Sequence, residues 1–355
     1  MPGPRSPTGW QRARLGSRHV PKSGYRAGMT AQPLATRHPR GAPLTSSTIR
    51  PALRELYAGG GLDLPLPAAG ATWARWHALA ELAAEDLSLA RLAEAHTDAV
   101  AILAELGVAA APGLWGVWAA EPLAARVQAE RTGGGWRLSG RKAWCSGAGL
   151  LDAALVTVYA EDGRRLMAVD VADLVVLPGT WSAVGMVASA AETVELRGVK
   201  GREVGGPGAY LERAGFWHGG VGVAACWYGG AVGAARTLLS AARSRPLGPH
   251  ALAHLGAVDA VVTGMLAVLQ EAAAEVDAEP HGSGAELRAR RVRAQVEAGA
   301  TEVLDRVGRA LGAEPLCLDA VHAQRAADLP VYLRQSHAER DLADLGSLAV
   351  ERAGW

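Results

Sequence analysis

The sequence predicts an α+β fold in which an antiparallel β-domain, a barrel or a sandwich, separates two helical regions. Apolar residues recur every three or four positions before about Gly107 and again after about Gly208, whereas the period between them is two. With 355 residues the chain is long enough for more than one domain. We therefore expect a shortened helical domain at 46–112, a β-domain at 113–207 and a C-terminal four-helix bundle at 208–355.

An N-terminal extension, residues 1–45, precedes these regions. It is rich in Arg, Pro, Gly and Ser, and it has too few apolar residues to bury a core or to act as a signal peptide. The three cysteines of the chain lie far apart without a CxxC pair, which is typical of reduced thiols. We therefore expect a disordered extension, a cytoplasmic protein and no metal site.

The charge pattern argues against nucleic acid and membrane as partners. The formal net charge is +1, and both signs are spread along the chain. We expect no membrane-spanning helix, because the most apolar stretch, 219–235, is short and contains six glycines. These glycines lack the pattern of a phosphate-binding loop, so we interpret them as contacts between closely packed helices.

The first helical region contains a short helix that begins after Ser46 or Ser47 and a longer one that begins after Asp86. The apolar face of the longer helix includes His96. This pattern allows two interpretations. His96 is either a hydrogen-bonded core residue or a side chain aimed into a cofactor pocket.

The middle region consists of short strands joined by glycine-rich turns, with no helical pattern between them. This arrangement favours a barrel or a sandwich. The predicted strands are 114–120, 127–131, 136–145, 153–159, 165–171 and 193–196.

A polar and aromatic group marks the end of the strand at 136–145. Alternation along the strand would place Lys142, Trp144 and Ser146 on one face. An aromatic ring beside a hydroxyl could hold a planar ligand with a polar edge. The alternative interpretation is that Trp144 belongs to a core or an interface.

The C-terminal region shows the helical period in four long segments, as expected for a bundle. These segments are 211–240, 251–276, 287–311 and 329–345.

Four motifs, in order, resemble those of the acyl-CoA dehydrogenase superfamily of flavoproteins. GRKAWCS at 140–146 resembles the family's G-x-K-x-W-I-T segment, and GVWAAEP at 116–122 resembles its T-E-P motif. ARSRPLG at 242–248 resembles the R-x-x-F-G loop, and PVYLR at 330–334 resembles the stretch before the catalytic loop. The resemblance covers residues 46–345 and implies the family's fold.

The resemblance also implies an FAD cofactor. Trp144 would lie against the flavin, and the Ser146 hydroxyl would meet the flavin edge near N5. Arg245 would reach the pyrophosphate of a neighbouring subunit, because a guanidinium fork matches phosphate oxygens. The cofactor-binding positions carried over from the strand motifs are Trp118, Ala120, Trp144, Cys145 and Ser146.

The activity implied by the resemblance is α,β-desaturation of an acyl thioester, with acyl-CoA as substrate and a homodimer or homotetramer as the assembly. Most family members use a glutamate base, which counting places at Ala343 or, in a second arrangement, near Gly219. Neither position carries a carboxylate. The candidate catalytic residues are therefore Asp341, His218 and His96.

Two other functions fit the same sequence. Some superfamily members resemble dibenzothiophene-type monooxygenases, which use reduced flavin and dioxygen, and His96 together with the GVW segment at 116–118 favours that branch. The altered base and phosphate-binding positions also fit a catalytically inactive scaffold that binds an acyl group or a flavin.

Overall fold

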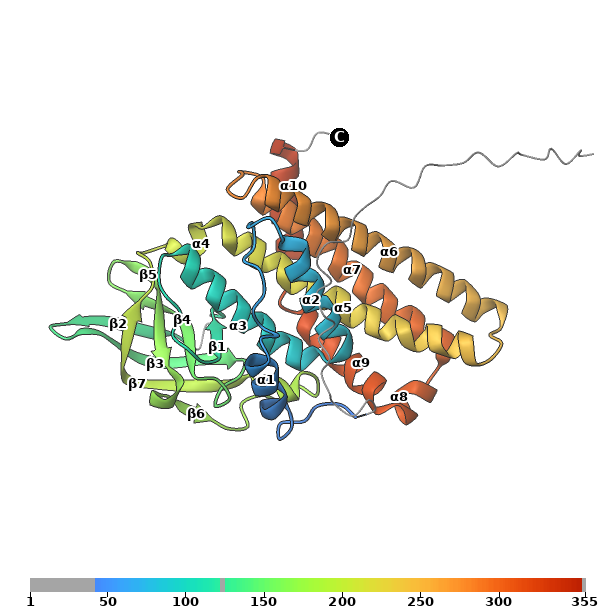
Figure 1. Ribbon diagram of the computed structural model, residues 1–355, viewed down its shortest axis with the longest axis horizontal. Coiled ribbons are helices and arrows are strands. Elements are labelled where there is room, and N and C mark those ends of the chain that lie inside the picture. The colour runs from blue at the N-terminus through green and yellow to red at the C-terminus, as the bar shows by residue number, and fades with distance from the viewer. Residues whose placement is uncertain (1–41, 122–124, 353–355) are drawn as a thin grey trace, which may run out of the picture. The chain divides into compact units, whose positions relative to one another are not determined.

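The computed structural model describes residues 42–121 and 125–352 (Figure 1), and the predicted N-terminal extension lies almost wholly outside them. The first helices are α1 (Ile49–Ala58), α2 (Thr72–Glu85) and α3 (Leu87–Glu105). The strands are β1 (Trp115–Trp118), β2 (Val127–Thr132), β3 (Gly135–Cys145), β4 (Ala153–Ala160), β5 (Gly163–Asp170), β6 (Val175–Leu177) and β7 (Glu192–Glu203), with 3-10 turns at Val171–Asp173 and Val187–Ser189. The last helices are α4 (Ala209–Glu212), α5 (Ala214–Ser244), α6 (Pro249–Ala278), α7 (Ala285–Leu311), α8 (Glu314–Leu318), α9 (Ala320–Leu333) and α10 (Glu339–Arg352).

This order confirms the predicted mixed fold, in which strands lie between two helical regions. The division into separate domains stays a prediction. Local signals act as expected: the Asp86 carboxylate accepts a hydrogen bond from the Leu89 N–H at 2.8 Å and so caps α3. The turn between β2 and β3 is made by Gly133 and Gly134.

The sheet is a partly closed barrel. Strands β4, β2, β3, β7 and β5 form a ring, because β4 also pairs with β5. Closure between β2 and β4 depends on a single pair, Gln128 with Tyr159. The expectation of a wholly antiparallel domain is wrong. The chain makes the β2–β3 hairpin before it returns to β4, and β4 then runs parallel to both β1 and β2.

The predicted fourth bundle helix, 329–345, is also wrong as one continuous element. It is divided into α9 and α10 by residues 334–338. Ala338 has a φ of 48°, which interrupts a right-handed helix. Its N–H donates to the Ser336 hydroxyl at 3.1 Å, and the His337 N–H donates to the Asp341 carboxylate at 2.9 Å. These side chains satisfy amides that a continuous helix would have bonded itself.

The glycines of α5 are packing contacts, as interpreted from the sequence. A Cβ at Gly229 would lie 2.0 Å from the Ala80 carbonyl oxygen of α2, so only glycine allows this approach of the two backbones. Helix α3 packs on the barrel through an apolar cluster that includes Ile102, Leu103 and Trp115. The helical region and the barrel are therefore held together through α3.

Helix α6 differs from its neighbours in being apolar but largely uncovered. By length and composition it could cross a membrane, and only 17% of its most apolar window is buried. The expectation that no apolar segment is long enough to span a membrane is therefore wrong for α6. A bundle helix with one unpartnered apolar face meets the same criterion.

Candidate functional site

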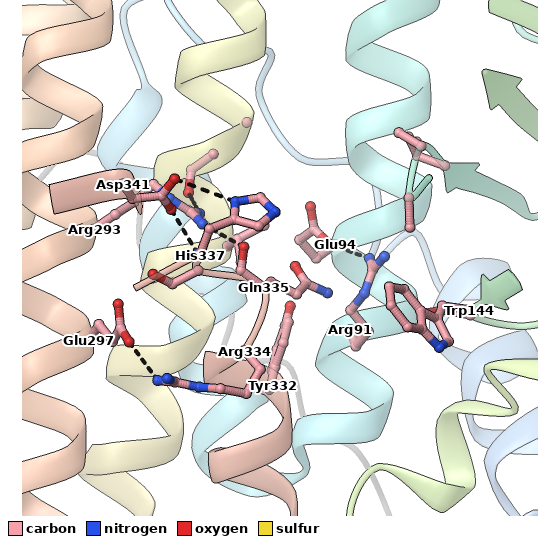
Figure 2. A pocket seen from close by; sticks show the side chains of 18 of the residues that line it. Arg91, Glu94, Trp144, Arg293, Glu297, Tyr332, Arg334, Gln335, His337 and Asp341 are labelled. Atoms are coloured by element: carbon pink, nitrogen blue, oxygen red, sulfur yellow. Dashed lines mark hydrogen bonds and ion pairs between the residues drawn. The ribbon is translucent and has the colours of Figure 1, made fainter. Parts of the chain in front are cut away.

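A cleft of about 1790 Å³ lies between the barrel, α3, α5, α7 and the segment that joins α9 to α10 (Figure 2). Small-molecule sites usually occupy roughly 300–1,000 Å³. The cleft therefore has room for a cofactor and a substrate together.

The barrel contributes an exposed ring and a hydroxyl to this cleft. Trp144 is 55% exposed although it is large and apolar, and its φ of 58° places it in a bulge at the end of β3. Ser146 lies beside it, and the Ser146 hydroxyl makes no hydrogen bond within residues 42–121 and 125–352. Trp118 fixes this corner, because its Nε1 donates to the Ser146 carbonyl oxygen at 3.0 Å.

The bulge corrects the prediction that Lys142 shares a face with Trp144. Lys142 is buried, and its Nζ donates to the Thr157 hydroxyl at 2.7 Å, with Glu121 Oε1 3.7 Å away. Burial lowers the pKa of Lys142 to about 8. The positive φ at Trp144 breaks the alternation, so the strand sends the lysine inward and the ring into the cleft.

Helix α3 brings two carboxylates and a guanidinium to the cleft. Arg91 donates to Glu94 at 2.6 Å, and Asp98 follows one turn later. Burial raises the pKa of Glu94 to about 7 and also raises the pKa of Asp98, against the opposing charge of nearby arginines. Figure 2 shows Arg91 and Glu94 on the same side of the cleft as Trp144.

The segment between α9 and α10 supplies His337 and Asp341. His337 Nδ1 lies 3.4 Å from the Asp341 carboxylate, and Arg290 lies 3.8 Å from Asp341 and 3.1 Å from Asp344. Burial alone would raise the pKa of Asp341, but the hydrogen bond from the His337 N–H and the neighbouring positive charges lower it. Figure 2 shows the other ring nitrogen of His337 turned away from Asp341. Asp341 is therefore a weak base, and it orients His337.

Two arginines, one of them exposed, hold this segment in place. Arg293 donates to the Gly220 carbonyl at 2.8 Å and to the Gln335 carbonyl at 3.1 Å, and its guanidinium lies 4.6 Å from the centre of the Trp227 ring. Arg334 forms an ion pair with Glu297 of α7. The cleft wall formed by 334–338 is thus tied to both α5 and α7.

The other two candidate catalytic residues lie outside the cleft. His96 accepts the Trp115 N–H at 3.1 Å and packs edge-on against Tyr57, and burial lowers its pKa to about 4. His218 Nε2 lies 3.0 Å from the Pro280 carbonyl oxygen, and burial lowers its pKa. Of the two interpretations of His96, the geometry matches the hydrogen-bonded core residue.

Only some of the remaining predicted cofactor-binding residues line the cleft. Trp118 and Ala120 line the cleft together with Trp144 and Ser146. Cys145 does not, because its thiol faces the Lys142 carbonyl, and burial raises its pKa to about 12. Arg245 lies at the turn after α5, where it forms an exposed ion pair with Glu314 at 3.4 Å.

The sequence analysis missed Arg91, Glu94, Asp98 and His337. A signal for the first three was present, since charged residues spaced three and four apart interrupt an otherwise apolar helix. His337 lies about one and a half turns before Ala343, the position to which counting assigns the base, and was set aside because the segment was predicted to be one continuous helix. In the part of the chain that the structure describes, no three His, Cys, Asp or Glu residues are grouped to hold a metal ion.

Comparison with known proteins gives matches among solved structures alone. No protein-family model and no curated protein sequence matches the chain. The structure is similar to FMN-bound TdsC from Paenibacillus sp. A11-2, with 19% identity, a TM-score of 0.71, and coverage of 88% of this chain and 92% of that chain. It is similar to the methanesulfinate monooxygenase MsuC from Pseudomonas fluorescens, with 18% identity, a TM-score of 0.72, and coverage of 88% and 91%.

A third similar structure is KijD3 in complex with FMN and an amino-keto dTDP-sugar, with 19% identity, a TM-score of 0.69, and coverage of 88% and 89%. TdsC is described as a dibenzothiophene monooxygenase. At these identities the matches establish the fold rather than an activity. The chain therefore has the acyl-CoA dehydrogenase fold.

Proposed function

We propose that the protein is a flavin-dependent monooxygenase that acts on a small molecule. The observation that carries this proposal is the His337–Asp341 pair on the cleft wall, close in sequence to Ala343, where the resemblance would place a glutamate base and no carboxylate is present. Asp341 is held by His337 and Arg290 and has a lowered pKa, so it is poorly suited to abstract the α-proton of an acyl thioester.

The cleft residues fit a flavin. Trp144 offers an uncovered ring face, and the Ser146 hydroxyl beside it has no partner in the described chain. Both features match an isoalloxazine ring, which is flat and carries hydrogen-bonding groups at its edge. A bound flavin would supply the electrons that reduce dioxygen. Trp144 and Ser146 would hold and orient it, and His337 would hold or release a proton at Nε2.

FMN is the better supported form of the cofactor. Two similar structures contain FMN, whereas the expected pyrophosphate ligand Arg245 is engaged by Glu314. FAD would add an adenosine monophosphate unit to FMN, and that unit needs a further site. Chromatography of flavin released from the purified protein distinguishes the two forms.

Desaturation of an acyl thioester remains the second candidate because of one observation. A Cβ at Gly219 would lie 2.7 Å from Asp98 Oδ1, so a carboxylate lies beside the position of the alternative glutamate base. Acyl-CoA as substrate depends on this second candidate.

Two experiments on the FMN-loaded protein separate these reactions. Reduced protein mixed with ¹⁸O₂ and indole, as an aromatic probe, or benzylamine, as an amine probe, should place one labelled oxygen atom in a product, as judged by mass spectrometry. Anaerobic mixing of the oxidised protein with octanoyl-CoA should leave the flavin absorbance unchanged. Bleaching by octanoyl-CoA, or no label from either probe, would contradict the monooxygenase proposal.

We also propose that a second copy of the chain packs on α6. Leu252 on this helix is 50% exposed, and a Cβ at Gly256 or Gly264 would meet no atom within 4 Å, so the face is open and smooth. Light scattering coupled to size exclusion should give a dimer or tetramer. A monomer at micromolar concentration would rule out this use of α6.

A further inference from the structure

Two carboxylates on α3 face the cleft one helical turn apart, and the proposed oxygen chemistry gives them no role. Glu94 and Asp98 are four residues apart, which places both on one face of the helix. Glu94 is 5% exposed and is engaged by Arg91 at 2.6 Å. Burial raises the pKa of both carboxylates although Arg91, Arg75 and Arg213 oppose that shift, so this wall favours a shared proton or a bound cation.

Asp98 is the carboxylate of this pair that lacks a partner. Within the described residues it accepts no hydrogen bond, and no basic group lies within 4.0 Å of it. The two arginines whose charges act most strongly on Asp98 donate their hydrogen bonds to other groups. Arg213 donates to Glu105 at 2.8 Å, and Arg75 of α2 donates to the Pro65 carbonyl at 3.2 Å. The Asp98 oxygens are therefore free to accept a hydrogen bond from a ligand.

A buried hydroxyl lies on the far side of the same space. The Tyr332 side chain is 2% exposed, and its hydroxyl makes no hydrogen bond within the described residues. Figure 2 shows the hydroxyl end of Tyr332 pointing toward Gln335, between α9 and the α3 wall. An unsatisfied buried hydroxyl costs stability unless a ligand or water completes it. The cleft thus presents unused acceptors from two of its walls.

We propose that this part of the cleft binds an amine substrate, and that Asp98 binds its ammonium group and accepts its proton. An ammonium donates hydrogen bonds, so it matches the free oxygens of Asp98 and the lone pairs of Tyr332. Arg91 does not repel it strongly, because Glu94 neutralises Arg91 directly. The inference relies on the proposed monooxygenase function only for the later fate of the amine.

The proton transfer prepares nitrogen for oxidation. An ammonium nitrogen has no lone pair, so it cannot take up an oxygen atom. When one N–H bond breaks and one O–H bond forms on Asp98, the amine regains its lone pair and no electrons are transferred. Glu94 supports this step, because a proton on either carboxylate lowers the repulsion between them.

Calorimetric titration of the oxidised, FMN-loaded full chain with benzylamine and with benzyl alcohol tests the proposal without turnover. The amine should bind at least about tenfold more tightly than the alcohol, as expected for a hydrogen bond to a charged group. The preference should grow as the pH rises from about 6 to about 8, because the pair then loses its shared proton. Asp98→Asn should reduce the preference to within about twofold.

Two further variants keep the result interpretable. Asp259→Asn, an exposed change on α6, should leave the preference intact. Glu94→Gln should keep the preference but remove most of its pH dependence, because Asp98 then titrates without a partner. Equal binding of amine and alcohol to the wild type, or a preference retained in Asp98→Asn, would overturn the inference. Amine preference without oxygen incorporation would instead refute only the monooxygenase function.

Discussion

Replacing Trp144 with alanine should weaken FMN binding by about one order of magnitude. Trp144 is 55% exposed. For a side chain of about 250 Å² this corresponds to about 140 Å², and a flat ligand packed on one face would cover about half of it. Burial of about 70 Å² at about 25 cal/mol per Å² is worth about 1.7 kcal/mol, or about 20-fold in Kd.

The assay is a fluorescence titration of FMN into the protein, with two companion variants. Trp73→Ala removes a tryptophan that packs against His77 on α2 outside the cleft, so FMN affinity should stay within about twofold of the wild type. Trp144→Gly should lose affinity as the alanine variant does. It should also stabilise the fold relative to alanine by about 1 kcal/mol, because glycine relieves the positive φ at this position. A folded Trp144→Ala protein with unchanged FMN affinity would refute the contact.

Three other perturbations test separate parts of the account. Gly229→Ala should cost about 3 kcal/mol of unfolding free energy in urea, because its Cβ would meet a backbone oxygen at 2.0 Å. Gly308→Ala on α7, where an added Cβ would meet no atom within 4 Å, should be neutral or stabilising. Burial raises the pKa of Asp328 to about 6 in the folded protein. The unfolding free energy of the wild type should therefore fall relative to that of Asp328→Asn as the pH rises from about 4 through 6. A difference in unfolding free energy that stays constant over this range would exclude the titration. His337→Gln should lower the rate of product formation at least about 100-fold and leave FMN affinity within about twofold, and an unchanged rate would remove His337 from the mechanism.

The sequence was sufficient where local chemistry decides the structure. Asp86 caps α3, the glycine pair at 133–134 turns the hairpin, and Gly229 permits the α2–α5 contact, all as the residue types indicate. The order of helices and strands is predicted correctly by the spacing of apolar residues along the sequence. The motif at 140–146 predicts the fold that the similar structures share.

The failures arose where tertiary structure overrode a local pattern. Alternation put Lys142 beside Trp144, but the bulge separates them, since Lys142 has partners inside the barrel. Helical period continued through 334–338, yet the amides there are satisfied by Ser336 and Asp341 instead. His96 fitted the apolar face of α3 equally well as a ligand or a core residue, and the Trp115 amide decides between them.

The most direct test of the central claim is an absorption spectrum of the purified protein after incubation with FMN, and separately with FAD, followed by desalting. The account predicts that the flavin bands remain with FMN, near stoichiometric occupancy, and that Trp144→Ala loses them on desalting. Flat spectra after both incubations would contradict it, because the cleft beside Trp144 and Ser146 would then not be a flavin site.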